Sequence, residues 1–189
     1  MWIKICGITR YEDAIVASDL GADAIGLVFT HSPRRVAPEA IRPWVHRLSN
    51  IEKVGVFTRE DPAYIVEIGE GLNLDTIQIH TRLTKGHYML ATRFKIIYAP
   101  KDYKNIRMPH VESRILIDPS MGSGNKACLH DVRSINIPFI LAGGLNPDNV
   151  KDAIKNASPI GVDVSSGVEC SPGIKDPELI ERFIKEARS

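Results

Sequence analysis

The sequence predicts a (β/α)8 barrel, and three observations support this fold class. Eight short apolar runs rich in β-branched residues recur along the chain, and helical patterns separate most of them. This alternation is typical of a parallel sheet whose strands are buried on both faces. Polar or ionisable residues close several runs, as at the C-terminal ends of barrel strands. We therefore expect one compact barrel domain over residues 1–189, with some outer helices shortened or degenerate.

The eight apolar runs are the expected barrel strands. Each is too short for a helix, and no low-complexity linker separates one run from the next. In chain order they are WIKIC (2–6), ADAIGLVF (22–29), EKVGVF (52–57), TIQIH (76–80), FKIIYA (94–99), RILID (114–118), PFILA (138–142) and IGVDV (160–164).

Helix-start signals lie between the runs. Three places put an Asp or Asn N-cap before a first-turn proline, and Pro38 marks a fourth start. Thr9 and Glu12 have the spacing of a capping box, with Gly21 closing the helix that follows. The connections at 100–113 and 125–134 leave room for a turn or two at most. The three N-cap and proline pairs are 61–62, 146–147 and 176–177.

A doubly wound open sheet is the alternative fold. The chain has 189 residues, whereas a (β/α)8 barrel usually takes about 250. The GSGNKA stretch at 122–127 also resembles a dinucleotide-binding fingerprint. That fingerprint belongs after the first strand of its unit, whereas this stretch follows the sixth and lacks the P-loop spacing. We therefore favour the barrel.

Composition points to a small-molecule ligand. Lys and Arg number 24 against 23 Asp and Glu, and the basic residues form no run, so neither nucleic acid nor a membrane surface is expected as a partner. No apolar segment reaches the roughly 18 residues of a membrane span, and we expect a cytoplasmic protein. Three cysteines far apart predict free thiols. No metal-ligand spacing is present.

Two loops at strand ends are suited to an anion. Gly143 and Gly144 follow the seventh run, and Ser165, Ser166 and Gly167 follow the eighth. Glycine lets backbone amides approach a ligand, and the hydroxyls add donors. Barrels commonly bind phosphate with the loops after strands seven and eight. The sequence therefore predicts a phosphate site, although Ser and Gly also dominate ordinary turns.

Ionisable residues mark other strand ends. Asp118 and Asp163 lie in buried strands, where an unpaired carboxylate is costly, and this favours a functional role. Cys6 alone could equally be a small buried apolar residue. His80 is a candidate binding residue, but a lone strand-end histidine is often a hydrogen-bonded core residue.

The loop HSPRRVAPE at 31–39 offers Arg34 and Arg35. An arginine fork matches a carboxylate or a phosphate in a bidentate pair. A solvated surface arginine is the other interpretation, and the loop alone does not decide between them.

The motifs KICGIT, GADAIGLVF, SPRRVAPE, KVGVF, ILAGGLNPDNV and GVDVSSGVECSPGIKD together closely resemble those of the phosphoribosylanthranilate isomerase family of tryptophan biosynthesis. The resemblance spans the chain. It implies a (β/α)8 enzyme that converts N-(5-phosphoribosyl)anthranilate to 1-(2-carboxyphenylamino)-1-deoxyribulose 5-phosphate by an Amadori rearrangement, without cofactor or metal. The partner it implies is a small phosphoribosyl substrate, and the chain is expected to be a monomer or a homodimer.

The resemblance also implies residue roles. Cys6 matches the general base, for which a lowered thiol pKa would help. Asp118 matches the general acid, and Arg34, which directly follows the Ser-Pro pair, matches the ligand of the anthranilate carboxylate. Asp163 is expected at the sugar hydroxyls. The phosphate is expected at Gly143, Gly144, Ser165 and Ser166.

The sequence departs from the family pattern at two places, and two other functions are alternatives. Thr81 replaces a glycine after the fourth strand, and MGSGNKACLHD at 121–131 lacks the family's aromatic end. The related isomerase of histidine biosynthesis is one alternative, although its first strand offers an aspartate where this chain has Cys6. A non-catalytic phosphate-binding barrel is the other, and it would need neither Cys6 nor Asp118.

Overall fold

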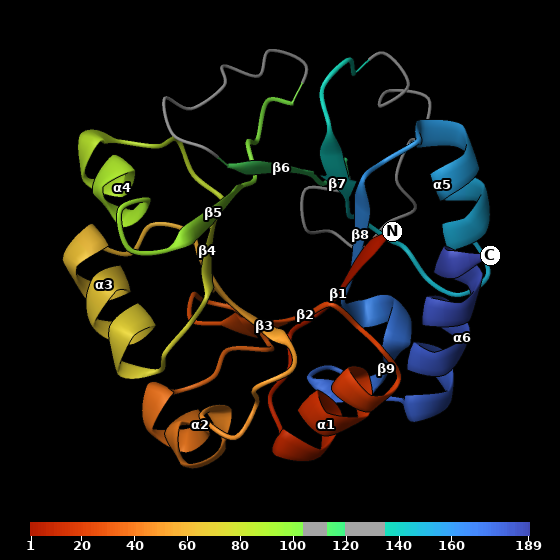
Figure 1. The fold of residues 1–189 in the computed structure, drawn as a ribbon, viewed down its shortest axis with the longest axis horizontal. Coiled ribbons are helices and arrows are strands. Elements are labelled where there is room, and N and C mark those ends of the chain that lie inside the picture. The colour runs from red at the N-terminus through yellow and green to blue at the C-terminus, as the bar shows by residue number, and fades with distance from the viewer. Residues whose placement is uncertain (104–112, 120–134) are drawn as a thin grey trace.

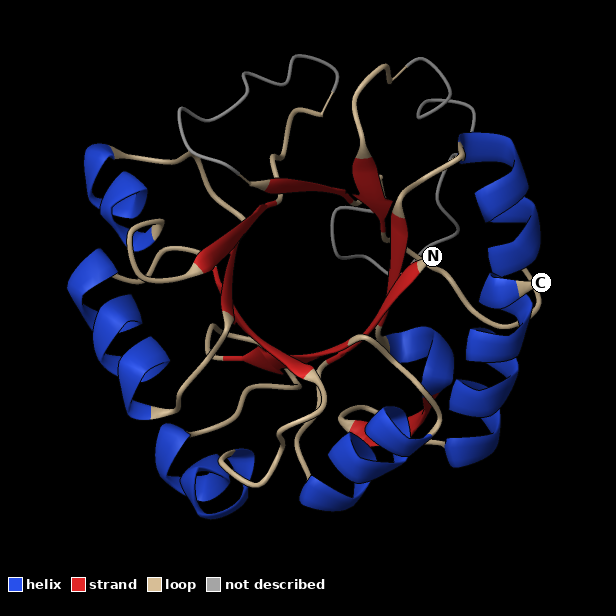
Figure 2. Cartoon of the chain, viewed as in Figure 1, coloured by secondary structure: helices blue, strands red, loops and turns tan. Residues whose placement is uncertain are grey.

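Eight parallel strands close into a barrel, as the sequence predicts (Figures 1 and 2). The computed structural model describes residues 1–103, 113–119 and 135–189. The strands follow one another around the barrel in chain order, and β8 pairs with β1 to close it. They are β1 (Trp2–Cys6), β2 (Ala24–Val28), β3 (Glu52–Phe57), β4 (Thr76–Ile79), β5 (Lys95–Tyr98), β6 (Arg114–Ile117), β7 (Phe139–Leu141) and β8 (Gly161–Val164).

The described helices lie on the outer side of the barrel (Figure 1). The α4 helix, which follows the fourth strand, has only six residues. The connection predicted to be degenerate at 125–134, and most of that at 100–113, lie outside the described residues. The described helices are α1 (Tyr11–Asp19), α2 (Pro38–Val45), α3 (Pro62–Gly71), α4 (Lys85–Leu90), α5 (Val150–Ala157) and α6 (Pro177–Arg188).

Two predicted N-caps are confirmed. The Asp61 carboxylate accepts from the Ala63 amide at 2.8 Å, and α3 begins at Pro62, directly after Asp61. The Asp176 carboxylate accepts from the first-turn amides of α6. Helix α2 begins at Pro38, also as predicted.

Two other predicted starts are wrong. Helix α5 begins at Val150, because 147–149 form a turn in which the Asn146 side chain accepts from the Asp148 and Asn149 amides. The capping box at Thr9 does not form, since α1 begins after Arg10 and the Thr9 hydroxyl donates to the Gly173 carbonyl at 2.6 Å. A tertiary contact therefore replaced the local one.

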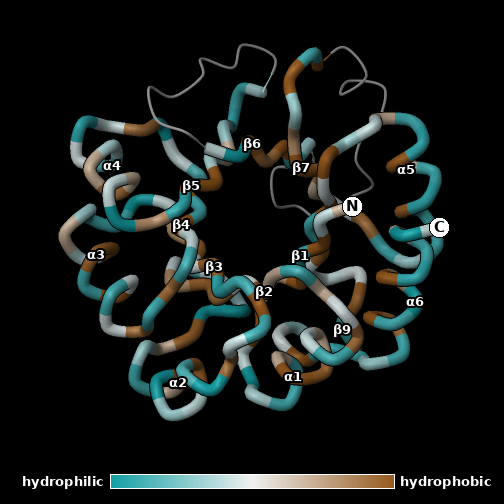
Figure 3. The backbone as a smooth tube through the Cα atoms, in the orientation of Figure 1, coloured by the Kyte–Doolittle hydropathy of each residue, from teal (hydrophilic) through white to brown (hydrophobic). Residues whose placement is uncertain are grey.

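Alternation along the strands separates two apolar layers. Successive side chains of a strand point to opposite faces, so one set fills the barrel and the other meets the helices. Ile3 and Ile5 of β1 belong to the larger cluster under the helices. A second cluster, inside the barrel, contains Ala24, Val54, Ile97, Ala99, Leu116, Ile140 and Ala142. Hydropathy follows this division, with apolar strands and polar outer helix faces (Figure 3).

A polar network closes the N-terminal end of the barrel. Glu52 accepts from the Trp2 indole at 3.2 Å and forms an ion pair with Arg114. The Arg114 guanidinium also lies 4.5 Å from the centroid of the Trp2 ring. These contacts close the end of the barrel that lies opposite the C-terminal ends of the strands.

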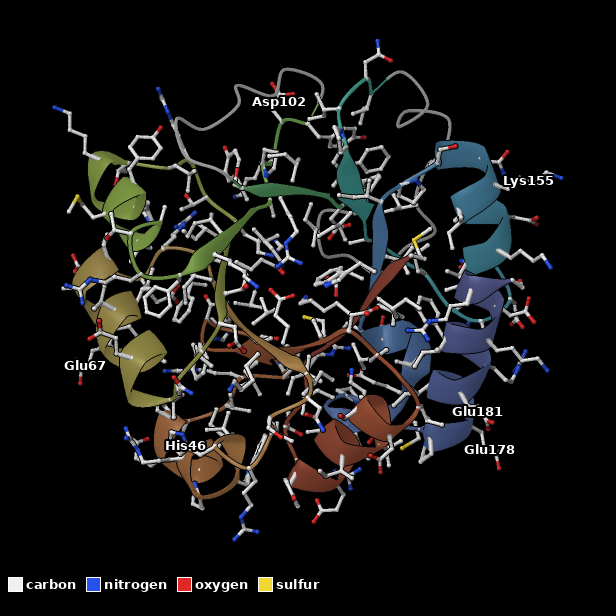
Figure 4. The ribbon with its side chains drawn as sticks, viewed as in Figure 1. His46, Glu67, Asp102, Lys155, Glu178 and Glu181 are labelled. Atoms are coloured by element: carbon white, nitrogen blue, oxygen red, sulfur yellow. The ribbon has the colours of Figure 1, made fainter. Side chains whose placement is uncertain are left out.

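Polar and charged side chains point away from the barrel on the outer ring. His46, Glu67, Lys155, Glu178 and Glu181 are exposed on this outer side (Figure 4). Within the described ranges, no helix is long and apolar enough to cross a membrane.

Candidate active site

One cavity of about 620 Å³ lies at the C-terminal ends of the strands. All eight strands or the loops that follow them contribute to its wall, so residues far apart in the sequence meet there. Its wall contains all nine residues that the sequence indicates as site residues: Cys6, Arg34, His80, Asp118, Gly143, Gly144, Asp163, Ser165 and Ser166.

Cys6 reaches the cavity because it occupies an inward position of β1. It pairs with Gly26 of β2, where an added Cβ would lie 2.6 Å from the Cys6 sulfur and 3.0 Å from Lys4 Cε. A glycine at 26 therefore leaves room for the thiol and for the lysine beneath it. The two side chains come from the same face of one strand, two residues apart.

A buried ion pair lies below the thiol. Lys4 lies opposite Asp163 in the β1–β8 ladder, and its ammonium donates to the Asp163 carboxylate at 2.8 Å. Burial alone lowers the pKa of Lys4, but Asp163 and Cys6 raise it above its ordinary value overall. Lys4 is therefore a cation inside the barrel, held by a carboxylate and close to a thiol.

Burial governs the ionisation of Cys6. The residue is 9% exposed, and its desolvation raises the pKa of the thiol, against the opposing effect of the Lys4 ammonium. The lowered thiol pKa that would help a general base is therefore not a property of Cys6 in the free protein. Lys4 limits the rise without reversing it.

His80 is neutral at physiological pH. Burial, followed by the nearby Lys4 cation, lowers its pKa to about 4. Its Nε2 lies 2.6 Å from the side-chain nitrogen of the buried Gln78. With the amide in this orientation, Gln78 donates and the histidine carries its proton on Nδ1. His80 thus lines the cavity and is hydrogen-bonded, and its role as a binding residue stays a prediction.

The two arginines of the loop after β2 differ in position. Arg34 lies in the cavity wall, whereas Arg35 is exposed and bridges to Val28 through its backbone. The Arg34 guanidinium forms a bidentate pair with Glu169, with Nε and Nη2 donating at 2.8 and 2.6 Å. Arg34 is thus not a freely solvated surface arginine.

The two anion-suited loops pack directly against each other. A Cβ added to Gly167 would lie 1.9 Å from the Leu145 carbonyl oxygen, so only glycine allows this approach. Gly143 and Gly144 have φ of 92° and 64°, which glycine adopts readily. The Asn149 side chain donates to the Gly144 carbonyl at 2.9 Å and fixes that peptide. The loops after β7 and β8 therefore form one surface.

Several residues of the site were not predicted from the sequence. Lys4, Gln78 and Glu169 belong to it or support it. Lys4 and Gln78 did carry a signal, because each occupies an inward position of a buried strand where a polar residue needs a partner. Thr81, which departs from the family pattern, also lines the cavity, whereas the altered stretch at 121–131 lies outside the described residues.

The described side chains hold no group of three or more His, Cys, Asp or Glu placed to bind a metal ion. The fold and cavity together define a (β/α)8 barrel with an anion-suited surface beside a thiol and two carboxylates.

Comparisons with known proteins identify the family. A family model described as N-(5'phosphoribosyl)anthranilate (PRA) isomerase matches residues 3–186. The isomerase of that name from Desulforudis audaxviator is 40% identical over 200 residues, covering 98% of this chain and 97% of its own. The crystal structure of phosphoribosyl anthranilate isomerase from Thermotoga maritima superposes with a TM-score of 0.87 at 36% identity, covering 100% and 98% of the two chains.

A second solved structure is of a phosphoribosyl anthranilate isomerase in complex with reduced 1-(o-carboxyphenylamino)-1-deoxyribulose 5-phosphate. It has a TM-score of 0.82 and 34% identity and covers 100% of this chain and 98% of its own. The chain therefore belongs to the N-(5′-phosphoribosyl)anthranilate isomerase family.

We predict that Cys6 of the free protein is alkylated by iodoacetamide more slowly than the exposed Cys170 at pH 7. The Cys6 thiol is buried and its pKa is raised by that burial, so little thiolate is present. Its alkylation rate should keep rising above pH 9. Mass spectrometry of each cysteine peptide against time gives both rates. Faster labelling of Cys6 at pH 7 would contradict the burial argument.

We predict that His80→Gln makes the stability of the fold less dependent on pH below 6.5. The pKa of His80 is about 4 in the folded chain and 6.5 when unfolded, so falling pH protonates the unfolded chain first. The stabilisation of the fold by neutral His80 is complete above pH 6.5 and is lost as the pH falls toward 4. Between pH 7 and 5 the wild type should lose about 2 kcal/mol more than the variant.

Urea unfolding at both pH values measures this difference, and the exposed His46→Gln is the control. Equal pH dependence in wild type and His80→Gln would show that His80 takes up its proton normally in the fold.

Proposed function

We propose that this chain catalyses the Amadori rearrangement of N-(5′-phosphoribosyl)anthranilate to 1-(2-carboxyphenylamino)-1-deoxyribulose 5-phosphate. One observation carries the proposal: a single cavity contains the Cys6 thiol and the Asp118 carboxylate together with Arg34 and two anion-suited loops. Family membership supports the same reaction. The ligand of the related structure resembles the product and has three parts: a phosphate, an open sugar chain and an aromatic carboxylate. The anion-suited loops, the Cys6 and Asp118 side chains, and Arg34 match these three parts in turn.

The two anionic ends of the substrate have separate binding elements. The joined loops at Gly143–Gly144 and Ser165–Ser166 receive the phosphate through backbone amides and hydroxyls. Arg34 receives the anthranilate carboxylate, because a guanidinium matches its planar shape. Asp163 contacts the sugar hydroxyls between them.

Asp118 acts as the general acid in the first step. Its proton passes to the furanose ring oxygen, the C1′–O bond breaks, and the nitrogen lone pair forms the C1′=N bond of a protonated Schiff base. Asp118 must hold a proton beforehand and is a carboxylate afterwards. Its position at the end of β6, in the cavity wall, supports this role.

Cys6 acts as the general base in the second step. Its thiolate takes the C2′ proton, and the electron pair of that bond neutralises the Schiff base to give an enolamine, which tautomerises to the ketone. Burial of the thiol opposes ionisation, so the adjacent Lys4 cation provides the stabilisation that the thiolate needs. One proton returns from Cys6 to Asp118 before the next turnover, and the balance is closed.

The alternatives account for less of the cavity. A phosphate-binding barrel without activity needs the loops after β7 and β8 but leaves Cys6 and Asp118 without a purpose. The histidine-pathway isomerase has an aspartate where this chain has Cys6. All residues given roles here belong to one chain, so we propose that a monomer is competent and that a homodimer would contain two independent sites. We place the reaction in the cytoplasm.

We predict that Asp118→Asn lowers kcat by about 10²- to 10⁴-fold, the usual contribution of general acid catalysis. The amide keeps the shape of the side chain but has no acidic proton for the ring oxygen. Loss of substrate fluorescence measures turnover, and the exposed Asp152→Asn is the control. A variant that kept half of the wild-type kcat would remove Asp118 from this role.

We predict that Arg34→Ala raises KM by about tenfold or more while changing kcat less, because the carboxylate pair forms in ground and transition states alike. Arg35→Ala is the matched control, since Arg35 is exposed beside it, and it should change KM less than twofold. Steady-state kinetics of both variants test the assignment. The opposite ranking would mean that the wrong arginine was chosen.

A further inference from the structure

Arg34 is held by Glu169 through only one of its two hydrogen-bonding edges. Glu169 Oε1 accepts from Nε at 2.8 Å and Oε2 accepts from Nη2 at 2.6 Å. A guanidinium has five N–H donors, so the edge formed by Nη1 and the second N–H of Nη2 is not occupied by this carboxylate. That edge can still take a second carboxylate in a bidentate pair.

Glu169 is itself held from behind. The Lys175 ammonium donates to Glu169 Oε1 at 2.7 Å, and the Gly173 amide donates to the same oxygen at 3.2 Å. Glu169 and Lys175 lie opposite each other in the small sheet of β9 (Glu169–Ser171) and β10 (Ile174–Lys175). Their side chains are 4% and 0% exposed. The carboxylate is therefore fixed before any ligand binds.

The charges of this cluster leave a surplus. Arg34 and Lys175 carry one positive charge each and Glu169 one negative charge, so the three together keep a net charge of +1 toward the cavity. Burial opposes ionisation of Glu169, but Arg34 and Lys175 lower the pKa of its carboxyl overall. Without Lys175, the pair with Glu169 would neutralise Arg34 and weaken its attraction for an anion.

The absence of a side chain at Gly7 allows the Arg34 side chain to cross the rim of the barrel. Gly7 has φ of 75°, and a Cβ there would lie 2.5 Å from Arg34 Cδ and 3.0 Å from the Ser165 hydroxyl. The arginine therefore crosses over the end of β1, beside the loop after β8, to reach Glu169. Arg34 belongs to the cavity wall, and Glu169 and Lys175 lie behind it.

We propose that Glu169, supported by Lys175, is a positioning residue that orients the free edge of Arg34 and so selects substrates that carry a carboxylate on the aromatic amine. The proposal rests on the proposed function, in which Arg34 binds that carboxylate. Glu169 touches neither substrate nor reacting atoms and acts through Arg34 alone.

Calorimetric binding of two stable ligands tests the proposal. One is reduced 1-(o-carboxyphenylamino)-1-deoxyribulose 5-phosphate, and the other is the same compound made with aniline, which lacks the ring carboxylate. Glu169→Gln should weaken binding of the first about tenfold and of the second less than twofold. Glu169→Asp keeps the charge but is too short to hold Arg34 and Lys175 together, and it should show the same selective loss.

A double-variant comparison separates positioning from a general structural effect. In an Arg34→Ala background, Glu169→Gln should cause no further loss for either ligand, because its effect passes through Arg34. In steady-state kinetics, Glu169→Gln should raise KM more than it lowers kcat. Thermal unfolding identifies any variant that fails to fold, and the other Glu169 variant then supplies the result.

Different outcomes would contradict the carboxylate-binding role of Arg34 or the positioning role of Glu169. If Arg34→Ala leaves the preference for the carboxylated ligand intact, the carboxylate-binding role of Arg34 fails, and the positioning role fails with it. If Arg34→Ala abolishes the preference but both Glu169 variants keep it, only the role of Glu169 is wrong. Equal weakening of both ligands by the Glu169 variants would show a structural effect and would also overturn the proposal.

Discussion

The pairing of β1 with β8 is the constraint on which the site depends. It closes the barrel and places Lys4 opposite Asp163, with 2.8 Å between ammonium and carboxylate. A register shift of one residue would turn Lys4 and Cys6 into the apolar layer under the helices. Both buried charges would then lose their partners, which is far more costly than any gain from the pair itself. The same strand pairing therefore closes the sheet and places the Cys6 thiol in the cavity.

Much of the fold and the membership of the site could be predicted because they follow from local patterns. Strand runs of alternating faces specify which residues point inward, and the barrel rule then places strand ends at one rim. The positions of Cys6, Asp118 and the loop residues at that rim follow from these patterns, whereas their roles came from the resemblance to the family. The Asp61 and Asp176 caps are similarly local, whereas the Thr9 cap failed because the carbonyl of Gly173, 164 residues away, took its hydroxyl.

What could not be predicted depends on distant partners and on burial. The pair of Arg34 with Glu169 joins residues 135 positions apart, and no spacing rule connects them. The thiol pKa required knowing how strongly Cys6 is desolvated and that Lys4 lies beside it. A sequence motif gives the residue type at a position, but the balance between desolvation and nearby charge exists only in three dimensions.

Lys175 connects the two elements that we propose to bind the anionic ends of the substrate. Its buried ammonium donates to Glu169 at 2.7 Å and to the Ser165 carbonyl at 3.1 Å, so one cation holds both the support of Arg34 and the loop after β8. That loop packs in turn on the loop after β7 through Gly167. In the proposed reaction, a substrate that is anionic at both ends would meet two elements held at a fixed separation. Binding of both ends would position its central carbons beside Cys6 and Asp118, the proposed base and acid.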